Sequence, residues 1–128
     1  MTFTNEEIEK IFFSALCDGT HYLGGYGLSG PEVDNELYFA AKSKLEAEGK
    51  DTCQEDIWMQ ALKDGACLTI FDEEGDGEYT SSITIQDVYE RVPMCREKEL
   101  LNIHNEEYDA EDADVLIQYV FFQEIVFG

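Results

Sequence analysis

The chain has 128 residues, 44% of them hydrophobic and 12% aromatic, and its 29 Asp and Glu residues outnumber its 8 Lys and Arg residues, which gives a formal net charge of -21. The apolar content excludes a disordered chain, and the length fits a single domain spanning residues 1–128. The charge excludes direct binding to nucleic acid, because affinity for phosphate comes from Lys and Arg side chains.

The first predicted element is an amphipathic helix that starts after Thr4 and stops at Gly19. Thr4 and Glu7 match a capping box, and apolar residues then recur at helical spacing. The following segment, 18–31, contains five glycines and two tyrosines and predicts a loop. It lacks the lysine of a phosphate-binding loop and follows no recognisable strand, so it is either a flexible connector or an adaptable binding loop.

Two further helices are predicted before residue 66. Pro31 suits the first turn of the second helix, where its missing N–H costs nothing, and Gly49 ends that helix. Thr52, followed by Glu55, opens the third helix, which ends at Gly65.

A β-hairpin is predicted from residue 67 to residue 85, and the rest of the chain is expected to pack around it. Period-two alternation places Leu68 and Ile70 on one face and Thr69 and Phe71 on the other. Gly75 and Gly77 are expected to supply the positive φ angles that the turn needs. The acidic side chains of the tip are Asp72, Glu73, Glu74, Asp76 and Glu78.

Three helices are predicted after the hairpin. Thr84 and Asp87 cap a short one that Pro93 limits, and a second fits residues 96–105. The last begins at Asp109, whose side chain is a good N-cap. Its apolar residues form two stripes, so it is either central to the core or part of a subunit interface. The second stripe, through which a homo-oligomer would form, is Val115, Tyr119, Phe122 and Val126.

These elements predict an α+β fold: a mostly helical single domain of five to six helices packed around one β-hairpin. The acidic amino terminus does not resemble a secretory signal, and the apolar run 115–127 is short and interrupted by polar residues. A cytoplasmic protein that does not enter membranes is therefore expected. The four cysteines are too far apart for the close pairs of zinc sites, and they are expected to be reduced and buried.

The acidic residues are unevenly distributed along the chain. Residues 64–90 hold eight acids and residues 99–128 hold eight more, and neither stretch contains a Lys or Arg. Most of the bases gather at residues 42–63 and 91–98. One strongly negative face and one face closer to neutral are therefore expected.

The carboxyl-terminal segment carries the pattern Asp109-Ala110-Glu111-Asp112-Ala113-Asp114, then Gln118-Tyr119, Phe122, Glu124 and Phe127-Gly128. This pattern resembles one in small uncharacterised acidic proteins of gut-bacterial phages and mobile elements. The resemblance covers about a sixth of the chain, and Gln123 occupies a position where a glycine is expected. The resemblance implies a phage or mobile-element origin, with a bacterial host cytoplasm as the location. It does not imply a fold or a biochemical activity.

Candidate sites for chemistry are weak. Residues 72–77 match the opening of an EF-hand loop, but position twelve is Ile83 where that loop requires a bidentate Glu. Cys17 and His21 are close enough in sequence for a nucleophile and its base, yet the helix end and the negative charge of the protein disfavour a thiolate. No enzyme activity, metal site or cofactor is therefore predicted.

The remaining hypothesis is a non-enzymatic interaction protein that mimics DNA and inhibits a basic, nucleic-acid-handling protein. Duplex DNA carries about 21 charges over roughly 36 Å of its axis, which is also about the diameter expected for this domain. The residues expected to contact the partner are Asp72, Glu73, Glu74, Asp76, Glu78, Glu106, Glu107, Asp109, Glu111, Asp112 and Asp114. The alternatives are a self-associating assembly protein and, third, a small enzyme with an unrecognised site.

Overall fold

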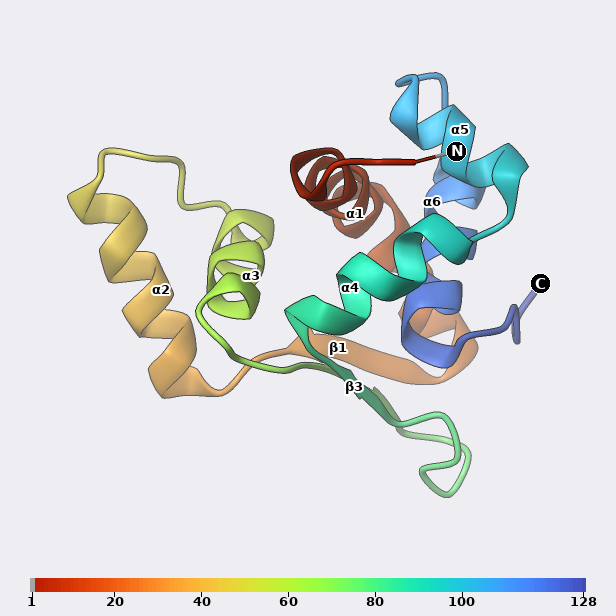
Figure 1. The fold of residues 1–128 in the computed structure, drawn as a ribbon. Coiled ribbons are helices and arrows are strands. Elements are labelled where there is room, and N and C mark those ends of the chain that lie inside the picture. The colour runs from red at the N-terminus through yellow and green to blue at the C-terminus, as the bar shows by residue number, and fades with distance from the viewer. Residues whose placement is uncertain (1) are drawn as a thin grey trace.

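A computed structural model describes residues 2–128 and confirms the α+β prediction. Within these residues six α-helices and a three-stranded antiparallel sheet form the domain (Figure 1). The α-helices are α1 (Asn5–Gly19), α2 (Asn35–Ala47), α3 (Gln54–Lys63), α4 (Ile85–Arg91), α5 (Glu97–His104) and α6 (Ala110–Phe122). The strands are β1 (Leu28–Glu32), β2 (Leu68–Asp72) and β3 (Ser81–Ile83), and two 3-10 helices are η1 (Thr20–Tyr26) and η2 (Val92–Met94).

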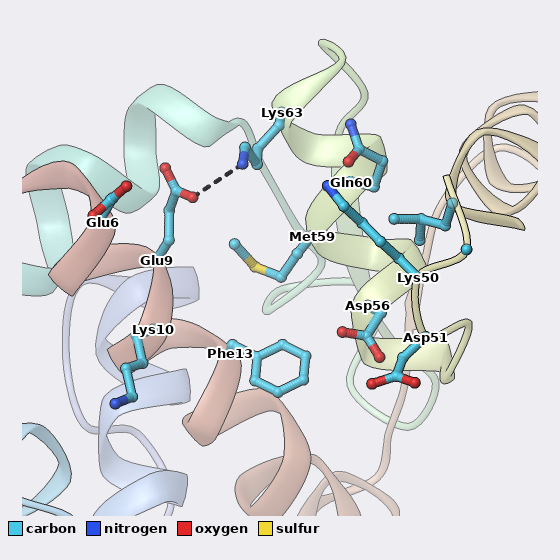
Figure 2. Close-up of a pocket in the computed structure, with 12 residues that line it drawn as sticks. Glu6, Glu9, Lys10, Phe13, Lys50, Asp51, Asp56, Met59, Gln60 and Lys63 are labelled. Atoms are coloured by element: carbon cyan, nitrogen blue, oxygen red, sulfur yellow. Dashed lines mark ion pairs between the residues drawn. The ribbon is translucent and has the colours of Figure 1, made fainter. Parts of the chain in front are cut away.

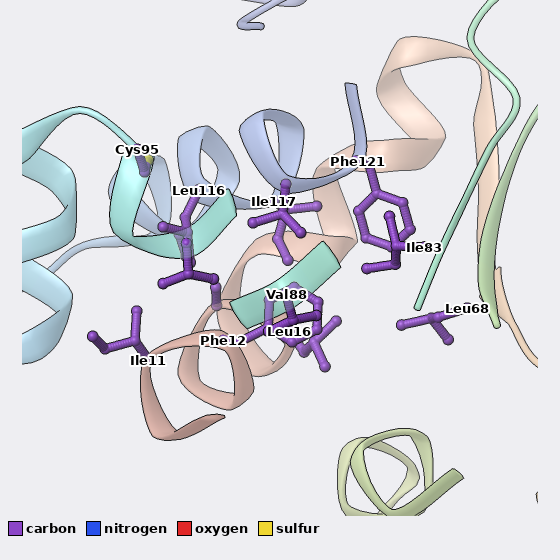
Figure 3. Packing of buried hydrophobic residues seen from close by; sticks show 14 of the residues in the cluster. Ile11, Phe12, Leu16, Leu68, Ile83, Val88, Cys95, Leu116, Ile117 and Phe121 are labelled. Carbon is purple, nitrogen blue, oxygen red and sulfur yellow. The ribbon is translucent and has the colours of Figure 1, made fainter. Parts of the chain in front are cut away.

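Helix α6 lies at the centre of the main core and packs most extensively on α1 (Figure 3). Its first stripe, which includes Leu116 and Ile117, is fully buried. The second stripe is half-buried, and three of its residues pack against the same core: Val115, Tyr119 and Phe122. Of the two readings that the sequence left open for this helix, the structure gives it the central place in the core.

The predicted hairpin forms from β2 and β3, with its alternation as expected. Leu68 and Ile70 are fully buried, whereas Thr69 is half-buried and Phe71 is 37% exposed. The turn differs from the prediction in one position: the positive φ angles belong to Asp76 (52°) and Gly77 (79°), not to Gly75. Aspartate tolerates the left-handed conformation better than most residues, which explains how it takes this role.

The glycine-rich segment is more ordered than the sequence predicted, and the loop assignment is wrong for most of it. Residues 20–26 form η1, and residues 28–32 form β1, which pairs with β2 through Leu28↔Asp72 and Ser29↔Phe71. The sheet therefore has the order β1-β2-β3. Period-two patterning is hidden in this strand because it is short and contains a glycine and a proline.

Two helix starts also differ from the prediction. Pro31 is a buried residue of β1, and α2 begins only after Asp34, whose carboxylate accepts hydrogen bonds from the Glu36 and Leu37 N–H groups at 3.0 and 3.4 Å. Asp34 is itself a strong N-cap, so it outcompetes Pro31 as the starting point. Helix α3 follows Cys53 without a side-chain cap, so Thr52 does not open it.

Helices α2 and α3 share a smaller second core made of Ala41, Leu45, Ile57, Ala61 and Ala66. Helix α2 lies at one side of the molecule, away from α1 and α6 (Figure 1). Within residues 2–128, every helix is too short or too polar to cross a membrane. All four cysteines are free thiols, but only Cys95 is buried, so the expected burial is wrong for Cys17, Cys53 and Cys67.

Candidate functional site

The hairpin tip is a well-defined turn because Asp72 holds it together. Its carboxylate accepts hydrogen bonds from the Gly75 N–H at 2.8 Å and the Tyr79 N–H at 3.1 Å. These backbone donors, Tyr79 first, lower the pKa of Asp72 because they stabilise its charged form. The Thr80 hydroxyl in turn accepts from the Asp72 N–H at 3.0 Å. Asp72 therefore stabilises the conformation of the tip.

The other four predicted tip residues, Glu73, Glu74, Asp76 and Glu78, point their charge at solvent. All four are exposed, and the Ser29 hydroxyl donates to Glu73 at 2.7 Å. Among residues 2–128, none of these carboxylates forms an ion pair with a Lys, Arg or His side chain. The tip thus presents four uncompensated negative charges on a turn held by hydrogen bonds.

The second predicted acidic segment, 106–114, divides into surface and interior residues. Asp109 and Asp112 form the capping box of α6, with the Asp112 N–H donating to Asp109 at 2.9 Å. Asp112 is 9% exposed and Asp114 is 7% exposed. The assignment of Asp112 and Asp114 to a partner-contacting surface is therefore wrong, since helix capping and core packing place them inside the molecule.

Asp114 is the centre of a buried polar network. The Tyr26 hydroxyl donates to its Oδ2 at 2.7 Å and the Gln118 amide donates to the same oxygen at 3.0 Å, while Oδ1 has no partner among the described residues. Burial raises the pKa of Asp114. Fully buried Gln118 also accepts from the N–H groups of Val126 and Phe127, at 2.9 and 2.7 Å. This network attaches η1 and the chain end to α6.

The exposed part of the segment consists of Glu106, Glu107, Asp109 and Glu111. Glu106 forms an ion pair with Lys10 at 3.3 Å. Asp109 caps the first turn of α6, whereas the sheet meets the last turn, where the Ser81 hydroxyl donates to the Phe121 carbonyl. Because a helix of 13 residues is about 20 Å long, the tip and this segment lie at opposite ends of α6 (Figure 1). They do not merge into one patch.

Acidic and basic residues are also segregated over longer stretches of the chain. Residues 20–41, 64–90 and 99–128 contain 19 of the 29 acids and no Lys or Arg, while the other ten acids share the rest of the chain with all eight bases. The fold brings the three base-free stretches together, since β1 pairs with β2 and both η1 and β3 contact α6. The sequence alone did not identify residues 20–41 as part of this acidic region. They hold few acids, and the absence of Lys and Arg was their only signal.

A cavity of about 590 Å³ opens between α1, α3 and the connection from α2 to α3 (Figure 2). Phe13 and Met59 form part of its apolar lining. Glu9 pairs with Lys63 at 3.2 Å and accepts from the Tyr89 hydroxyl at 2.7 Å. Burial and this hydrogen bond raise the pKa of Tyr89 to about 12.

The chemistry of this cavity is limited. Its polar lining consists of carboxylates, lysines and one glutamine, with no Ser, Cys or His beside them. Burial and the adjacent Asp51 raise the pKa of Asp56 (Figure 2). The four carboxylates and three lysines of the lining nearly balance in charge. We assign it no catalytic arrangement, because Lys10, Lys50 and Lys63 all form ion pairs and a protonated lysine is not a nucleophile.

The Cys17 and His21 pair does not form a dyad. Cys17 is exposed at the end of α1, and partial burial together with Glu55, Asp18 and Asp56 raises its pKa to about 11, which suppresses the reactive thiolate. The His21 ring instead stacks on Tyr22, with ring centroids 4.6 Å apart. Across residues 2–128, no group of three or more His, Cys, Asp or Glu side chains is arranged to hold a metal ion.

Comparison with protein-family models, with curated proteins and with solved structures gives no match to this chain.

Proposed function

We propose that the chain is an acidic interaction protein that binds the basic surface of a nucleic-acid-handling protein in a bacterial cytoplasm, in the manner of a DNA mimic. The observation that carries the proposal is the base-free region formed by residues 20–41, 64–90 and 99–128. Three of its 19 acids, Glu99, Asp112 and Asp114, are buried. Asp64, Asp87 and Glu106 pair with bases from other parts of the chain. The remaining carboxylates raise the local concentration of a positively charged partner and speed its association.

The hairpin tip is the best-defined contact point in this region. Its four exposed carboxylates are preorganised by the backbone hydrogen bonds of Asp72, so little conformational entropy is lost when a partner binds. The segment from Glu106 to Glu111 lies about one helix length away, at the other end of α6. Two separated acidic contacts fit a partner groove of DNA dimensions better than a single small cationic ligand.

The two alternatives have less support. A homo-oligomer through Val115, Tyr119, Phe122 and Val126 would need side chains that are already half-buried; Phe122 packs edge-on against Tyr79, with ring centroids 5.9 Å apart. An enzyme would need a site, and the cavity beside α1 has no Ser, Cys or His, while its three lysines all form ion pairs.

The proposal is tested by capturing proteins from a bacterial lysate on the immobilised chain at low and high salt, and then adding a short DNA duplex. We expect captured nucleic-acid-binding proteins that are released both by salt and by the duplex, because DNA and the acidic surface would compete for one basic groove. The triple variant Glu73→Gln, Glu74→Gln, Asp76→Asn should reduce capture at least about tenfold, since loss of several charge contacts costs more than 1.4 kcal/mol.

The matched control is the triple variant Glu46→Gln, Glu48→Gln, Glu97→Gln. It removes the same net charge from exposed positions in the part of the chain that also holds the bases. Capture should be nearly unchanged in this control. Equal losses of capture in both variants would show that net charge alone explains the binding. Captured proteins that stay bound when the duplex is added would contradict DNA mimicry.

A further inference from the structure

Two exposed apolar side chains, Leu37 of α2 and Phe71 of β2, lie on the same hollow. Among residues 2–128, the exposed large hydrophobic side chains are Leu37 (47%), Phe39 (58%), Phe71 (37%) and Met94 (69%). Phe39 lines a different hollow, with Tyr38 and Trp58, and Met94 lies in η2. Leu37 and Phe71 come from distant parts of the chain, so their meeting on one hollow of a strongly charged protein indicates a binding surface.

Leu37 and Phe71 line one hollow, which we call the α2–sheet groove. Its volume is about 590 Å³. The residues that line it are Glu32, Val33, Asp34, Asn35, Leu37, Gly65, Ala66, Cys67, Thr69 and Phe71. Thr69 and Phe71 belong to the face of β2 opposite the core, so the groove runs between α2 and the outer side of the sheet. The helices α1, α4 and α6 all lie on the other side (Figure 1).

The charges around this groove are of one sign. Glu32 and Asp34 line it, Glu36 follows in the first turn of α2, and none of the lining residues is a Lys or Arg. Asp34 already caps α2 with one oxygen, and Glu32 is exposed. The groove therefore offers apolar surface at its centre and carboxylates at its edge, within the base-free region.

We propose that the α2–sheet groove is the docking site for a basic amphipathic segment of the partner. An apolar side chain of that segment enters between Leu37 and Phe71, and its flanking Lys or Arg side chains pair with Glu32 and Asp34. This inference rests on the proposed function and adds its specificity element: the acidic surface attracts any basic protein, whereas the groove selects those with an apolar anchor beside the basic residues.

Charge complementarity decides between the candidate occupants. A second copy of this chain would bring another net charge of -21 against the acidic edge of the groove, which opposes docking. A basic segment gains from the same carboxylates. Burying a Leu or Phe side chain removes its apolar surface from water, so the anchor should change affinity by tenfold or more.

The test uses two synthetic helical peptides of equal positive charge, one with Leu and Phe at spacings i and i+4 among Lys residues, the other with Ser at those positions. Binding is measured by fluorescence anisotropy to the full chain. We expect the apolar peptide to bind at least about tenfold more tightly. The double variant Leu37→Gln, Phe71→Thr should abolish this difference, because both substitutions keep the local secondary-structure preference while removing the apolar surface.

The control is Met94→Gln, which removes a more exposed apolar side chain (69%) outside the groove and should leave both affinities unchanged. Equal binding of the two peptides to the wild-type chain would overturn the groove inference while leaving the acidic interaction function intact. Binding of neither peptide at low salt would contradict the proposed function itself. An increase in the molecular mass of the chain that the double variant abolishes would show that a second copy occupies the groove, and it would likewise overturn the inference.

Discussion

At the scale of single residues, the environment decides what each carboxylate does. Asp72 accepts two backbone hydrogen bonds and shapes the tip, whereas Asp76 is exposed in the left-handed conformation of the same turn. Asp114 is buried against Tyr26 and Gln118 and contributes to the interior. Net charge alone therefore overstates the number of carboxylates that a partner can reach.

Gln123 is a residue whose backbone conformation gives a direct prediction. It follows the last residue of α6 with φ of 61°, and its N–H donates to the Tyr119 carbonyl at 2.7 Å. Glycine suits this position because it lacks the Cβ that makes the left-handed conformation costly. Gln123→Gly should raise the free energy of unfolding by about 0.5–1 kcal/mol, measured by urea denaturation.

The neighbouring Glu124→Gly is the control for this prediction, because Glu124 is exposed and has no positive φ. It should be neutral or destabilising, since added glycine entropy favours the unfolded chain. Stabilisation of both variants by the same amount would mean that removing a side chain from the tail, and not relief of the backbone, is responsible.

At the scale of elements, the close approach of α1 and α6 organises the domain. Gly19 ends α1 against the first turn of α6, and a Cβ there would lie 2.7 Å from the carbonyl carbon and oxygen of Ala113 and 2.9 Å from the Asp114 nitrogen. These contacts are with backbone, which cannot rotate away as a side chain can. Glycine at this position is therefore required by packing.

Gly19→Ala should consequently destabilise the protein by about 1–3 kcal/mol, because α1 and α6 must move apart to accept the methyl group. Thermal unfolding followed by circular dichroism measures the effect. Gly24→Ala serves as the control, since a Cβ at Gly24 meets nothing within 4 Å and the residue has no positive φ. If Gly19→Ala were as stable as Gly24→Ala, the two helices would not be in the tight contact described above.

At the scale of the whole molecule, like charges oppose the compact state. The net charge of -21 adds a repulsive energy that hydrophobic burial must exceed. The six Lys and Arg ion pairs among residues 2–128 involve mostly exposed side chains of little energetic value. Salt screens this repulsion. Raising the salt concentration from about 0.01 M to about 1 M shortens the Debye length from about 30 Å to about 3 Å.

We therefore expect NaCl to raise the melting temperature at pH 7 by several degrees, equivalent to about 1 kcal/mol. Differential scanning calorimetry measures the shift. At a pH near the isoelectric point of about 4.1 the same salt should have little effect, since the net charge is then close to zero. A fall of the melting temperature with salt at pH 7 would show that attractive ion pairs outweigh the repulsion.

The sequence by itself determined the elements whose signals are local. The capping boxes at Thr4, Thr84 and Asp109 start their helices as predicted, and the alternation of Leu68 and Ile70 forms a strand with the predicted inner face. Such features depend on hydrogen bonds and side-chain directions within a few residues, so they can be read from the order of residues alone.

Only the tertiary structure decided which residues from distant parts of the chain share a surface. It added β1 to the hairpin, moved Asp112 and Asp114 into the interior, and separated the tip from residues 106–111 by the length of α6. It also brought Leu37 and Phe71 together in one groove. The physical reason is that burial and neighbourhood depend on how helices and strands pack, and that packing joins segments that no local pattern relates.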